Sequence, residues 1–391
     1  MRTQVGIVGA GPAGLFLSLL LQRAGVDCVV LESRSREYVE SRVRAGVLEE
    51  GTVALMEELG AAERLRREST PDPQLDIRYY GGTISMVLPE LTPGKLVTIY
   101  GQQEVVKDLI AARLARGGAI LFEAEASHIE GLTGDRPVIH FKHEGEAKTL
   151  ECDIVAGCDG FHGICRTQIP EHLLTVYDRI FPFGWLGILA ETKPFPEMTY
   201  SNHERGFSLA SRRSPRLARL YVQCAVDEDL EGWPDRRIWD ELKLRLYASG
   251  GELTEGPILQ KGVTPCRAYV AAPMRYGRMF LAGDAVHIVP PTGAKGLNLA
   301  AADVRVLSRA LIEFFRTGAT ERLDRYSDTC LKRVWKGVRY STYMTSLLHR
   351  FEAHTPFERR VQQAELEYVA GSLAARTTIA ENYVGLPFEE D

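Results

Sequence analysis

The glycine-rich run Gly9-Ala10-Gly11-Pro12-Ala13-Gly14 restricts the fold of this chain more than any other feature. The apolar residues 4–8 before it predict a strand, and residues 15–24 behind it predict an almost wholly apolar helix. A second strand, residues 26–31, ends in Glu32. This order is typical of a βαβ unit that binds a dinucleotide. The sequence therefore predicts an α/β protein, with mixed α+β character, built on a Rossmann-type unit.

Each conspicuous residue of this unit has a physical role. Gly9 makes the tight turn, Gly11 lets a pyrophosphate approach the backbone, and Gly14 lets helix and strand pack closely. Glu32 is placed to accept hydrogen bonds from ribose hydroxyls. A merely glycine-rich turn would not carry the flanking strands, the helix and the acid together. Near the N-terminus the arrangement suits FAD as readily as NAD.

Four arginines follow the ribose acid, at positions 34, 36, 42 and 44. A run of charges is usually a solvated helix face. Guanidinium groups also match phosphate oxygens, and these arginines follow the pyrophosphate loop. We favour phosphate contacts for Arg42 and Arg44, whereas for Arg34 and Arg36 both interpretations stay open.

A second stiff loop occurs late in the chain. Residues 279–282 predict a short buried strand that ends at Gly283-Asp284, and residues 297–315 show the apolar spacing of a helix. The intervening glycines and prolines exclude a regular element. The loop therefore leads into a helix N-terminus, which carries partial positive charge and free N–H donors. We expect an anionic or electron-rich group there.

Two further clusters are candidates for binding. A glycine loop at 157–166 contains Asp159, His162 and Arg166. A lone histidine is usually structural, but one beside an arginine in such a loop is also a cofactor candidate. Predicted strands at 204–213 and 217–226 place Ser211 and Arg213 on one face, and Arg219 and Tyr221 on one face. These side chains could form a cup for a small carboxylate, although ordinary cross-strand polar pairing explains the spacing at least as well.

Composition excludes several classes of protein. The net charge is only −5 over 391 residues, which argues against nucleic-acid and membrane-surface partners. The longest apolar run, residues 15–21, is too short to span a bilayer. The seven cysteines form no CxxC pair and predict reduced thiols in a cytoplasmic protein, with no metal site.

These motifs together resemble the single-component, FAD-dependent aromatic hydroxylases, over essentially the whole chain. The likeness is closest to the members that act on 4-hydroxybenzoate. The segments that carry it are residues 9–14 with Glu32, 42–49, 157–166, 182–187, 284–298 and 381–387.

The resemblance implies two sets of site residues. FAD would be bound by Gly9, Gly11, Ala13, Gly14, Glu32, Arg42, Arg44, Ala45, Gly46, Val47, Gln102, Asp159, Arg219, Asp284, Leu297 and Asn298. The substrate 4-hydroxybenzoate would be bound by Tyr200, Ser211, Arg213, Tyr221 and Pro291, with Ser211, Arg213 and Tyr221 on its carboxylate.

The resemblance also implies the reaction. Reduced FAD and O2 form a flavin C4a-hydroperoxide, which hydroxylates 4-hydroxybenzoate at C3 to give 3,4-dihydroxybenzoate. Catalytic roles fall to Tyr200 and Tyr383, which activate the phenol, and to Pro291, Lys295 and Asn298. The nicotinamide cofactor, NADPH with NADH possible, would contact Arg34, Tyr38, His162, Arg166 and Arg267.

Two positions depart from the family pattern. Where the family's proton path often ends at a histidine, this chain has Asp72 between two prolines. We therefore expect a different proton exit and a different pH profile. The nicotinamide segment has Ser33-Arg34 where other members carry an arginine and then a neutral residue, although Tyr38 is retained. Arg34 could still meet a 2′-phosphate, which favours NADPH and leaves NADH open.

The predicted organisation has three parts: residues 1–175 bind FAD, completed by 268–290; residues 176–267 form a β-sheet substrate domain; and residues 291–391 form a flavin-contacting helix and a helical interface region. The aromatic C-terminal helices suggest a homodimer. Two alternative functions remain: a flavin hydroxylase of another substituted benzoate, and an FAD-dependent dehydrogenase without oxygen insertion. A third alternative is a flavin-binding protein without catalytic activity.

Overall fold

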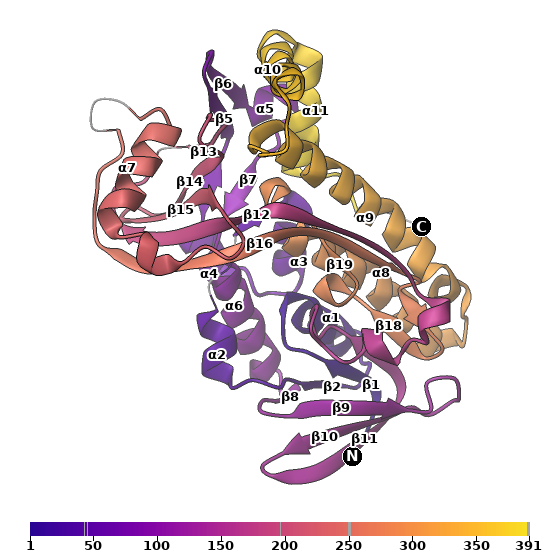
Figure 1. Ribbon diagram of the computed structural model, residues 1–391. Helices are drawn as coiled ribbons and strands as arrows, with labels where there is room; N and C mark the ends of the chain where they lie inside the picture. Colours follow the sequence, from indigo (N-terminus) through magenta and orange to yellow (C-terminus); the bar gives the residue numbers. More distant parts are fainter. Residues whose placement is uncertain (43, 45, 196, 249–251, 389–391) are drawn as a thin grey trace.

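The structure is a computed structural model that describes residues 1–42, 44, 46–195, 197–248 and 252–388. The chain forms two eight-stranded sheets and one small three-stranded sheet, with helices packed around them. Figure 1 shows the first sheet at the N-terminal end of the molecule and the second toward the other end, with the C-terminal helices along one side.

The first sheet contains the predicted βαβ unit. Strand β1 pairs in parallel with β2 on one side and with β11 on the other. Helix α1 (Pro12–Arg23) connects β1 and β2, and its residues 13–21 are all buried. The strands of this sheet are β1 (Arg2–Val8), β2 (Cys28–Leu31), β8 (Ala119–Leu121), β9 (Glu125–Glu130), β10 (Val138–His143), β11 (Glu146–Gly157), β17 (Arg275–Tyr276) and β18 (Met279–Leu281).

Two predicted elements are each divided in the structure. The apolar residues of 120–129 predict one strand, but the structure has two, because β8 joins β2 in parallel whereas β9 joins β10 in an antiparallel pair. The sequence of residues 52–68 predicts one helical segment, but the structure has two helices, α3 (Glu50–Glu58) and α4 (Glu63–Glu68). Apolar spacing continues through both breaks, so periodicity alone does not reveal the change of direction.

The second sheet has the strand order β19-β16-β12-β15-β14-β13-β5-β6. Strands β12 and β16 are long and antiparallel, and they cross the middle of the molecule side by side (Figure 1). The bounds are β5 (Gln74–Tyr79), β6 (Gly82–Val87), β12 (Thr175–Glu191), β13 (Met198–Ser201), β14 (Ser208–Ser214), β15 (Leu217–Cys224), β16 (Ile258–Ala272) and β19 (His287–Ile288).

The remaining elements cover the sheets. The small sheet is β3 (Val47–Leu48), β7 (Val97–Ile99) and β4 (Thr70–Asp72). The shorter helices are α2 (Arg36–Ser41), α5 (Leu88–Leu91), α6 (Gln102–Ala115) and α7 (Asp235–Arg245). The C-terminal helices are α8 (Gly296–Thr317), α9 (Glu321–Leu348), α10 (Pro356–Gly371) and α11 (Leu373–Val384). The domain boundaries given above stay a prediction; β5 and β6 join the second sheet although they precede residue 176.

Three properties bear on the expectations about chemistry and compartment. All seven cysteines have free, buried thiols. Among the described residues, no helix has the length and apolar character that crossing a membrane requires. In the same part of the chain, no group of three or more histidine, cysteine, aspartate or glutamate side chains could hold a metal ion.

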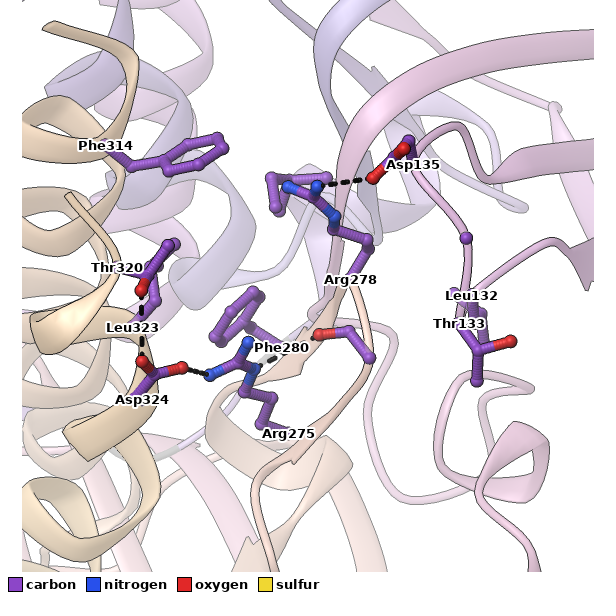
Figure 2. A pocket seen from close by; sticks show the side chains of 13 residues that line it. Leu132, Thr133, Asp135, Arg275, Arg278, Phe280, Phe314, Thr320, Leu323 and Asp324 are labelled. Carbon is purple, nitrogen blue, oxygen red and sulfur yellow. Dashed lines mark hydrogen bonds and ion pairs between the residues drawn. The ribbon is translucent and has the colours of Figure 1, made fainter. Parts of the chain in front are cut away.

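A cavity of about 350 Å³ lies beside β18 (Figure 2), and the residues that line it include none from the loop that follows this strand. Its polar walls include Arg275, which pairs with Asp324, and Arg278, which pairs with Asp135 at 2.9 Å. None of the predicted site residues lines it. Each arginine of this cavity therefore already has a carboxylate partner from the chain itself.

Candidate active site

The turn between β1 and α1 has the shape that a pyrophosphate needs. Gly9 has φ +102°, and a Cβ there would lie 2.3 Å from the carbonyl oxygen of Cys158. A Cβ on Gly11 would meet nothing within 4 Å, so the approach to the helix N-terminus is open. Gly11 also caps α1 without any side-chain hydrogen bond, which leaves backbone N–H donors for an anion.

Glu32 is held in place at the end of β2. One carboxylate oxygen accepts a hydrogen bond from the backbone N–H of Ala10 at 2.8 Å, and the other accepts one from Arg34 at 2.9 Å. The residue therefore links the pyrophosphate turn to the segment that follows β2. The open turn, the uncapped helix and the oriented acid fit the diphosphate and ribose of FAD.

The loop after β18 is fixed by a buried ion pair. The His287 ring and the Asp303 carboxylate are 2.6 Å apart, and the same oxygen of Asp303 accepts a bond from Gly283 N–H at 3.0 Å. Burial lowers the pKa of His287, but Asp303 outweighs this effect and the net pKa lies above its usual value. The pair thus anchors the turn that presents Asp284.

Several predicted residues are accessible to solvent and yet surrounded by protein. Asp284 and Arg44 are exposed, and Arg213 and Tyr221 are partly exposed. Burial nevertheless has the largest effect on the pKa of each, raising that of Asp284 and lowering those of Arg44 and Arg213.

The helix N-terminus beyond this loop is also free. Helix α8 begins at Gly296, and the residue before it, Lys295, makes no side-chain cap. The Asn298 side chain instead accepts bonds from Glu49 N–H (3.0 Å) and from the Thr52 hydroxyl (2.8 Å). The first N–H groups of α8 are therefore available to an electron-rich group, as the sequence predicts.

The register of the second sheet places two of the predicted substrate residues, Tyr200 and Tyr221, in one row. Tyr200 on β13 pairs with Leu209 on β14, and Leu209 pairs with Tyr221 on β15. Paired residues point to the same face, so Tyr200 and Tyr221 share a face two strand spacings apart, about 10 Å. Ser211 and its partner Arg219 lie on the same face.

The carboxylate cup contains two guanidinium groups and one phenol. Arg219 Nε donates to the Tyr221 hydroxyl at 3.2 Å. Burial raises the pKa of Tyr221, but the positive charges of Arg219 and Arg213 outweigh it, and the net pKa is lower than usual. Within the described part of the chain, neither arginine forms an ion pair with a carboxylate: Arg213 donates to the carbonyls of Gly46 and Arg44, and Arg219 donates to the Tyr221 hydroxyl. This contrasts with both arginines of the cavity in Figure 2.

Two details of the cup differ from the simple strand alternation that the sequence suggests. Arg213 lies at a β-bulge between Arg212 and Ser214, and its side chain contacts the backbone of the segment around Gly46. The Ser211 hydroxyl donates to the Arg219 carbonyl at 3.2 Å. Ser211 is therefore engaged with the neighbouring strand, whereas Arg213 connects the cup to the predicted flavin segment.

Two buried tyrosines stand at the other end of the row. Tyr200 and Tyr383 are each 1% exposed, and their rings lie 6.5 Å apart and nearly perpendicular. The Tyr200 hydroxyl donates to the Thr292 carbonyl at 3.2 Å, next to Pro291. Among the described residues, the Tyr383 hydroxyl has no hydrogen-bond partner of good geometry. Burial raises the pKa of both tyrosines.

Lys295 does not stand alone in this region. Its ammonium lies 2.7 Å from a carboxylate oxygen of Glu49 and donates to the Tyr383 carbonyl at 3.1 Å. Burial lowers the pKa of Lys295, Glu49 raises it, and Arg333 lowers it again. No role for Glu49 or Arg333 was predicted from the sequence. A charged residue on the buried face of α9, Arg333, is the signal that could have indicated this cluster.

The predicted nicotinamide residues occupy two places. Arg34 lies 5.5 Å from the centre of the Tyr38 ring near α2. His162, Arg166 and Arg267 gather elsewhere: Arg166 and Arg267 both stack on the Phe161 ring, and the His162 ring packs edge-on against it. Arg166 donates to the carbonyls of Phe161 and Ala285, and Arg267 pairs with Asp178.

The structure places the other predicted FAD contacts as follows. Ala13 is buried in α1, Val47 lies in β3, Gln102 begins α6, Leu297 lies in the first turn of α8, Arg42 caps the end of α2, and Asp159 accepts a bond from Cys165 N–H at 2.8 Å. Ala45 lies outside the described residues.

Comparisons with known proteins agree with this geometry. Residues 2–341 match the family described as FAD binding domain. The chain is 47% identical over 391 residues to the p-hydroxybenzoate hydroxylase of Acinetobacter baylyi, covering 100% of this chain and 96% of that protein. It is 26% identical over 341 residues to the para-nitrophenol 4-monooxygenase of Pseudomonas sp. strain WBC-3, covering 83% of this chain and 81% of that protein.

A solved structure supports the fold independently. The crystal structure of p-nitrophenol 4-monooxygenase from Pseudomonas putida matches with a TM-score of 0.84, at 22% identity, over 98% of this chain and 99% of that chain. At this identity the likeness establishes the fold alone. Together with the family match it confirms the predicted mixed α/β flavoprotein architecture. The chain belongs to the FAD binding domain family, among the FAD-dependent aromatic monooxygenases.

Proposed function

We propose that this protein hydroxylates 4-hydroxybenzoate at C3. The balanced reaction is 4-hydroxybenzoate, O2, NADPH and a proton giving 3,4-dihydroxybenzoate, NADP⁺ and water. One oxygen atom enters the ring and the other leaves as water, while NADPH supplies the two electrons. The 47% identical relative is named p-hydroxybenzoate hydroxylase, which supports this choice of substrate.

The observation that carries the proposal is the unpaired positive charge of the cup. Arg213 and Arg219 lie beside Tyr221 and form no ion pair in the described part of the chain, and Nη1 of Arg219 is buried without a hydrogen-bond partner. A buried cation is costly unless a counter-charge accompanies it. A benzoate carboxylate supplies that charge and accepts bonds from the Arg213 guanidinium and the Tyr221 hydroxyl.

The two tyrosines then account for the other end of the substrate. A free phenol has a pKa of about 10 and is mostly neutral at pH 7. The ring carbon next to it becomes sufficiently nucleophilic when the phenol proton is withdrawn. We assign this task to Tyr200 and Tyr383, because Tyr200 lies two strands from Tyr221 in the row and the buried Tyr383 ring lies 6.5 Å from the Tyr200 ring. A hydroxyl can accept one hydrogen bond while donating another, as a proton relay requires.

When bound, FAD would supply the redox chemistry, which is the acceptance of hydride from the nicotinamide cofactor and the activation of O2. The chain would hold its diphosphate at Gly9–Gly14, its ribose at Glu32, and its ring system near the free N–H groups of α8. Those N–H groups favour an anionic ring. Arg34, Tyr38, His162, Arg166 and Arg267 are our candidates for binding NADPH.

The test is oxidation of NAD(P)H by the purified holoprotein, with and without 4-hydroxybenzoate. We expect the aromatic acid to stimulate oxidation and to be converted to 3,4-dihydroxybenzoate, faster with NADPH than with NADH. A rate of NAD(P)H oxidation that does not change when the aromatic acid is added, or a reaction that yields only hydrogen peroxide, contradicts the proposal. A faster reaction with NADH would reverse only the cofactor preference.

We propose that the protein acts in the cytoplasm as a homodimer joined through its C-terminal helices. An apolar stripe on α10 contains Phe357, Val361 and Tyr368, which are 76%, 53% and 59% exposed, and Leu373 extends it. Large side chains at this spacing lie on one helix face and are unfavourable in water. The seven free thiols are compatible with a reducing compartment.

The double substitution Phe357→Glu with Val361→Glu is expected to separate the dimer, because charges cannot be buried in an apolar contact without a partner. Light scattering after size exclusion measures the mass, which should fall from twice 43.5 kDa to that of one chain. Leu259→Glu, an exposed leucine on β16, serves as the control and should leave the dimer intact. A wild-type monomer, or a dimer that survives both glutamates, rejects this interface.

Asp72 should make stability depend on pH. Burial raises the pKa of Asp72 to about 6, while N–H bonds from Gln74 and Met198 oppose the rise. Because the unfolded carboxyl ionises first, its contribution to stability is complete below pH 4 and is lost as pH rises through 6. Asp72→Asn should therefore raise Tm by about 2–4 °C at pH 7.5 and change it little at pH 4.5.

Thermal unfolding of both proteins at the two pH values measures this effect. Asp76→Asn is the matched control, because Asp76 lies on the neighbouring strand β5 and is only partly buried. A shift of the same size at both pH values would show that Asp72 does not titrate in this range.

A further inference from the structure

Arg333 connects three parts of the chain that are distant in sequence. It lies on α9 with its side chain 8% exposed. Its Nη2 is 3.0 Å from a carboxylate oxygen of Glu49, while its Nη1 donates to the carbonyls of Leu386 (2.8 Å) and Pro387 (2.5 Å). One planar guanidinium therefore binds both a buried acid and the backbone of the C-terminal segment.

The contacts of Arg333 form a closed ring with two of the predicted catalytic residues. The second oxygen of Glu49 binds the Lys295 ammonium at 2.7 Å. That ammonium also donates to the Tyr383 carbonyl at 3.1 Å. The chain then runs from Tyr383 through Gly385 to Leu386 and Pro387, where it returns to Arg333.

The C-terminal segment fits closely within this ring. Gly385 has φ +100°, and a Cβ there would lie 2.2 Å from a carboxylate oxygen of Glu49. Phe388 lies 5.3 Å from the Arg333 guanidinium and packs over Gly51, where a Cβ would meet its ring at 2.9 Å. The segment that follows Tyr383 therefore has little freedom to shift while these contacts persist.

The ring also sets the charge around Lys295. It contains two cations and one carboxylate, all nearly inaccessible, with side chains 4–8% exposed. Arg333 is one of the groups that lower the pKa of Lys295. A change at Arg333 would thus alter both the place of the C-terminal segment and the charge balance of the Lys295–Glu49 pair.

We propose that Arg333 is a positioning residue for hydroxylation, because it fixes the C-terminal segment and thereby the places of Tyr383 and of the Lys295 ammonium. This inference rests on the proposed function. Arg333 lies outside the substrate cup, so it acts through Tyr383 and Lys295 and not on the carboxylate of the substrate.

The test uses Arg333→Lys in the holoprotein, with Arg339→Lys as the matched control. Lysine keeps the charge but cannot bind Glu49 and two carbonyls in the same fork. Arg339 lies on the same helix and reaches the same α11, where it donates to Asn382 at 3.1 Å, but it is not part of the ring. Gly385→Ala is a second variant, which displaces the segment without removing any charge.

Two readouts separate positioning from simple destabilisation. We expect Arg333→Lys and Gly385→Ala to lower the product formed per NADPH by about tenfold, since small misplacements of reacting groups have effects of this size. A pH titration of the absorbance of bound 4-hydroxybenzoate should show its phenol ionising at higher pH than in the wild type. The Kd of the substrate should stay close to the wild-type value, because the cup is unchanged.

The outcomes distinguish this inference from the proposed function. If the wild-type protein makes no 3,4-dihydroxybenzoate, the proposed function is wrong. The wild type could instead be active while Arg333→Lys and Gly385→Ala match Arg339→Lys in product per NADPH and in the titration of the bound phenol. That result would overturn the role of Arg333 and leave the proposed function in place.

Discussion

Replacing Arg213 with alanine is expected to raise the Kd for 4-hydroxybenzoate by about 10- to 100-fold, because a charged hydrogen bond contributes roughly 1.5–3 kcal/mol. Arg213 lies beside Tyr221 and has no carboxylate partner within the described ranges; its guanidinium donates to the carbonyls of Gly46 and Arg44. The substrate carboxylate would be its counter-charge. Titration of the holoprotein with the aromatic acid, followed by flavin absorbance or fluorescence, measures the change.

The hairpin that carries Arg213 also provides the control. Arg216 lies exposed in the turn between β14 and β15, so Arg216→Ala removes a similar charge without touching the cup. Its Kd should match that of the wild type. The neutral analogue 4-hydroxybenzamide should bind weakly to the wild type and lose little further affinity in Arg213→Ala. Equal Kd values for wild type and Arg213→Ala would show that the carboxylate binds elsewhere.

Replacing Tyr383 with phenylalanine is expected to separate NADPH oxidation from hydroxylation. The variant should bind 4-hydroxybenzoate within a few-fold of the wild-type Kd, because the cup lies at the other end of the row. Product per NADPH should fall by about tenfold or more, since relays of this kind contribute 10²–10⁴-fold in rate. Parallel measurements of NADPH, O2 and 3,4-dihydroxybenzoate give the ratio.

Tyr343→Phe is a suitable control for this variant. Tyr343 lies on α9, and its hydroxyl donates to Glu365 at 2.9 Å and to neither Tyr200 nor Tyr383. It should retain wild-type coupling. Full coupling in Tyr383→Phe would remove this hydroxyl from the activation of the phenol, and loss of substrate binding would assign it a structural role instead.

The βαβ unit and the loop before α8 could be predicted from the sequence, because each depends on residues that are close together in the chain. The βαβ unit follows from the glycines, the apolar helix and Glu32, all within residues 4–32, and the structure has α1 and β2 close to the predicted places. The stiff loop before α8 was likewise predictable, because glycines and prolines end a strand and an apolar stripe begins a helix.

Features that depend on long-range contacts were not predictable from the residues. Alternation along β14 gives no sign of the bulge at Arg213. The partners of Lys295 are Glu49, which lies 246 positions away, and the carbonyl of Tyr383, which lies 88 positions away. Residue spacing alone could not decide whether the polar residues of these strands bind a carboxylate or form ordinary cross-strand pairs. The roles of Tyr200 and Tyr383 were predicted from the family resemblance.

Isotope labelling tests the central claim of a monooxygenase reaction most directly. The holoprotein is given 4-hydroxybenzoate and NADPH under ¹⁸O2, and the aromatic product is examined by mass spectrometry. We predict 3,4-dihydroxybenzoate that carries one ¹⁸O atom at C3, in an amount that matches the NADPH consumed. Unlabelled aromatic acid with all of the ¹⁸O recovered in hydrogen peroxide would contradict the account.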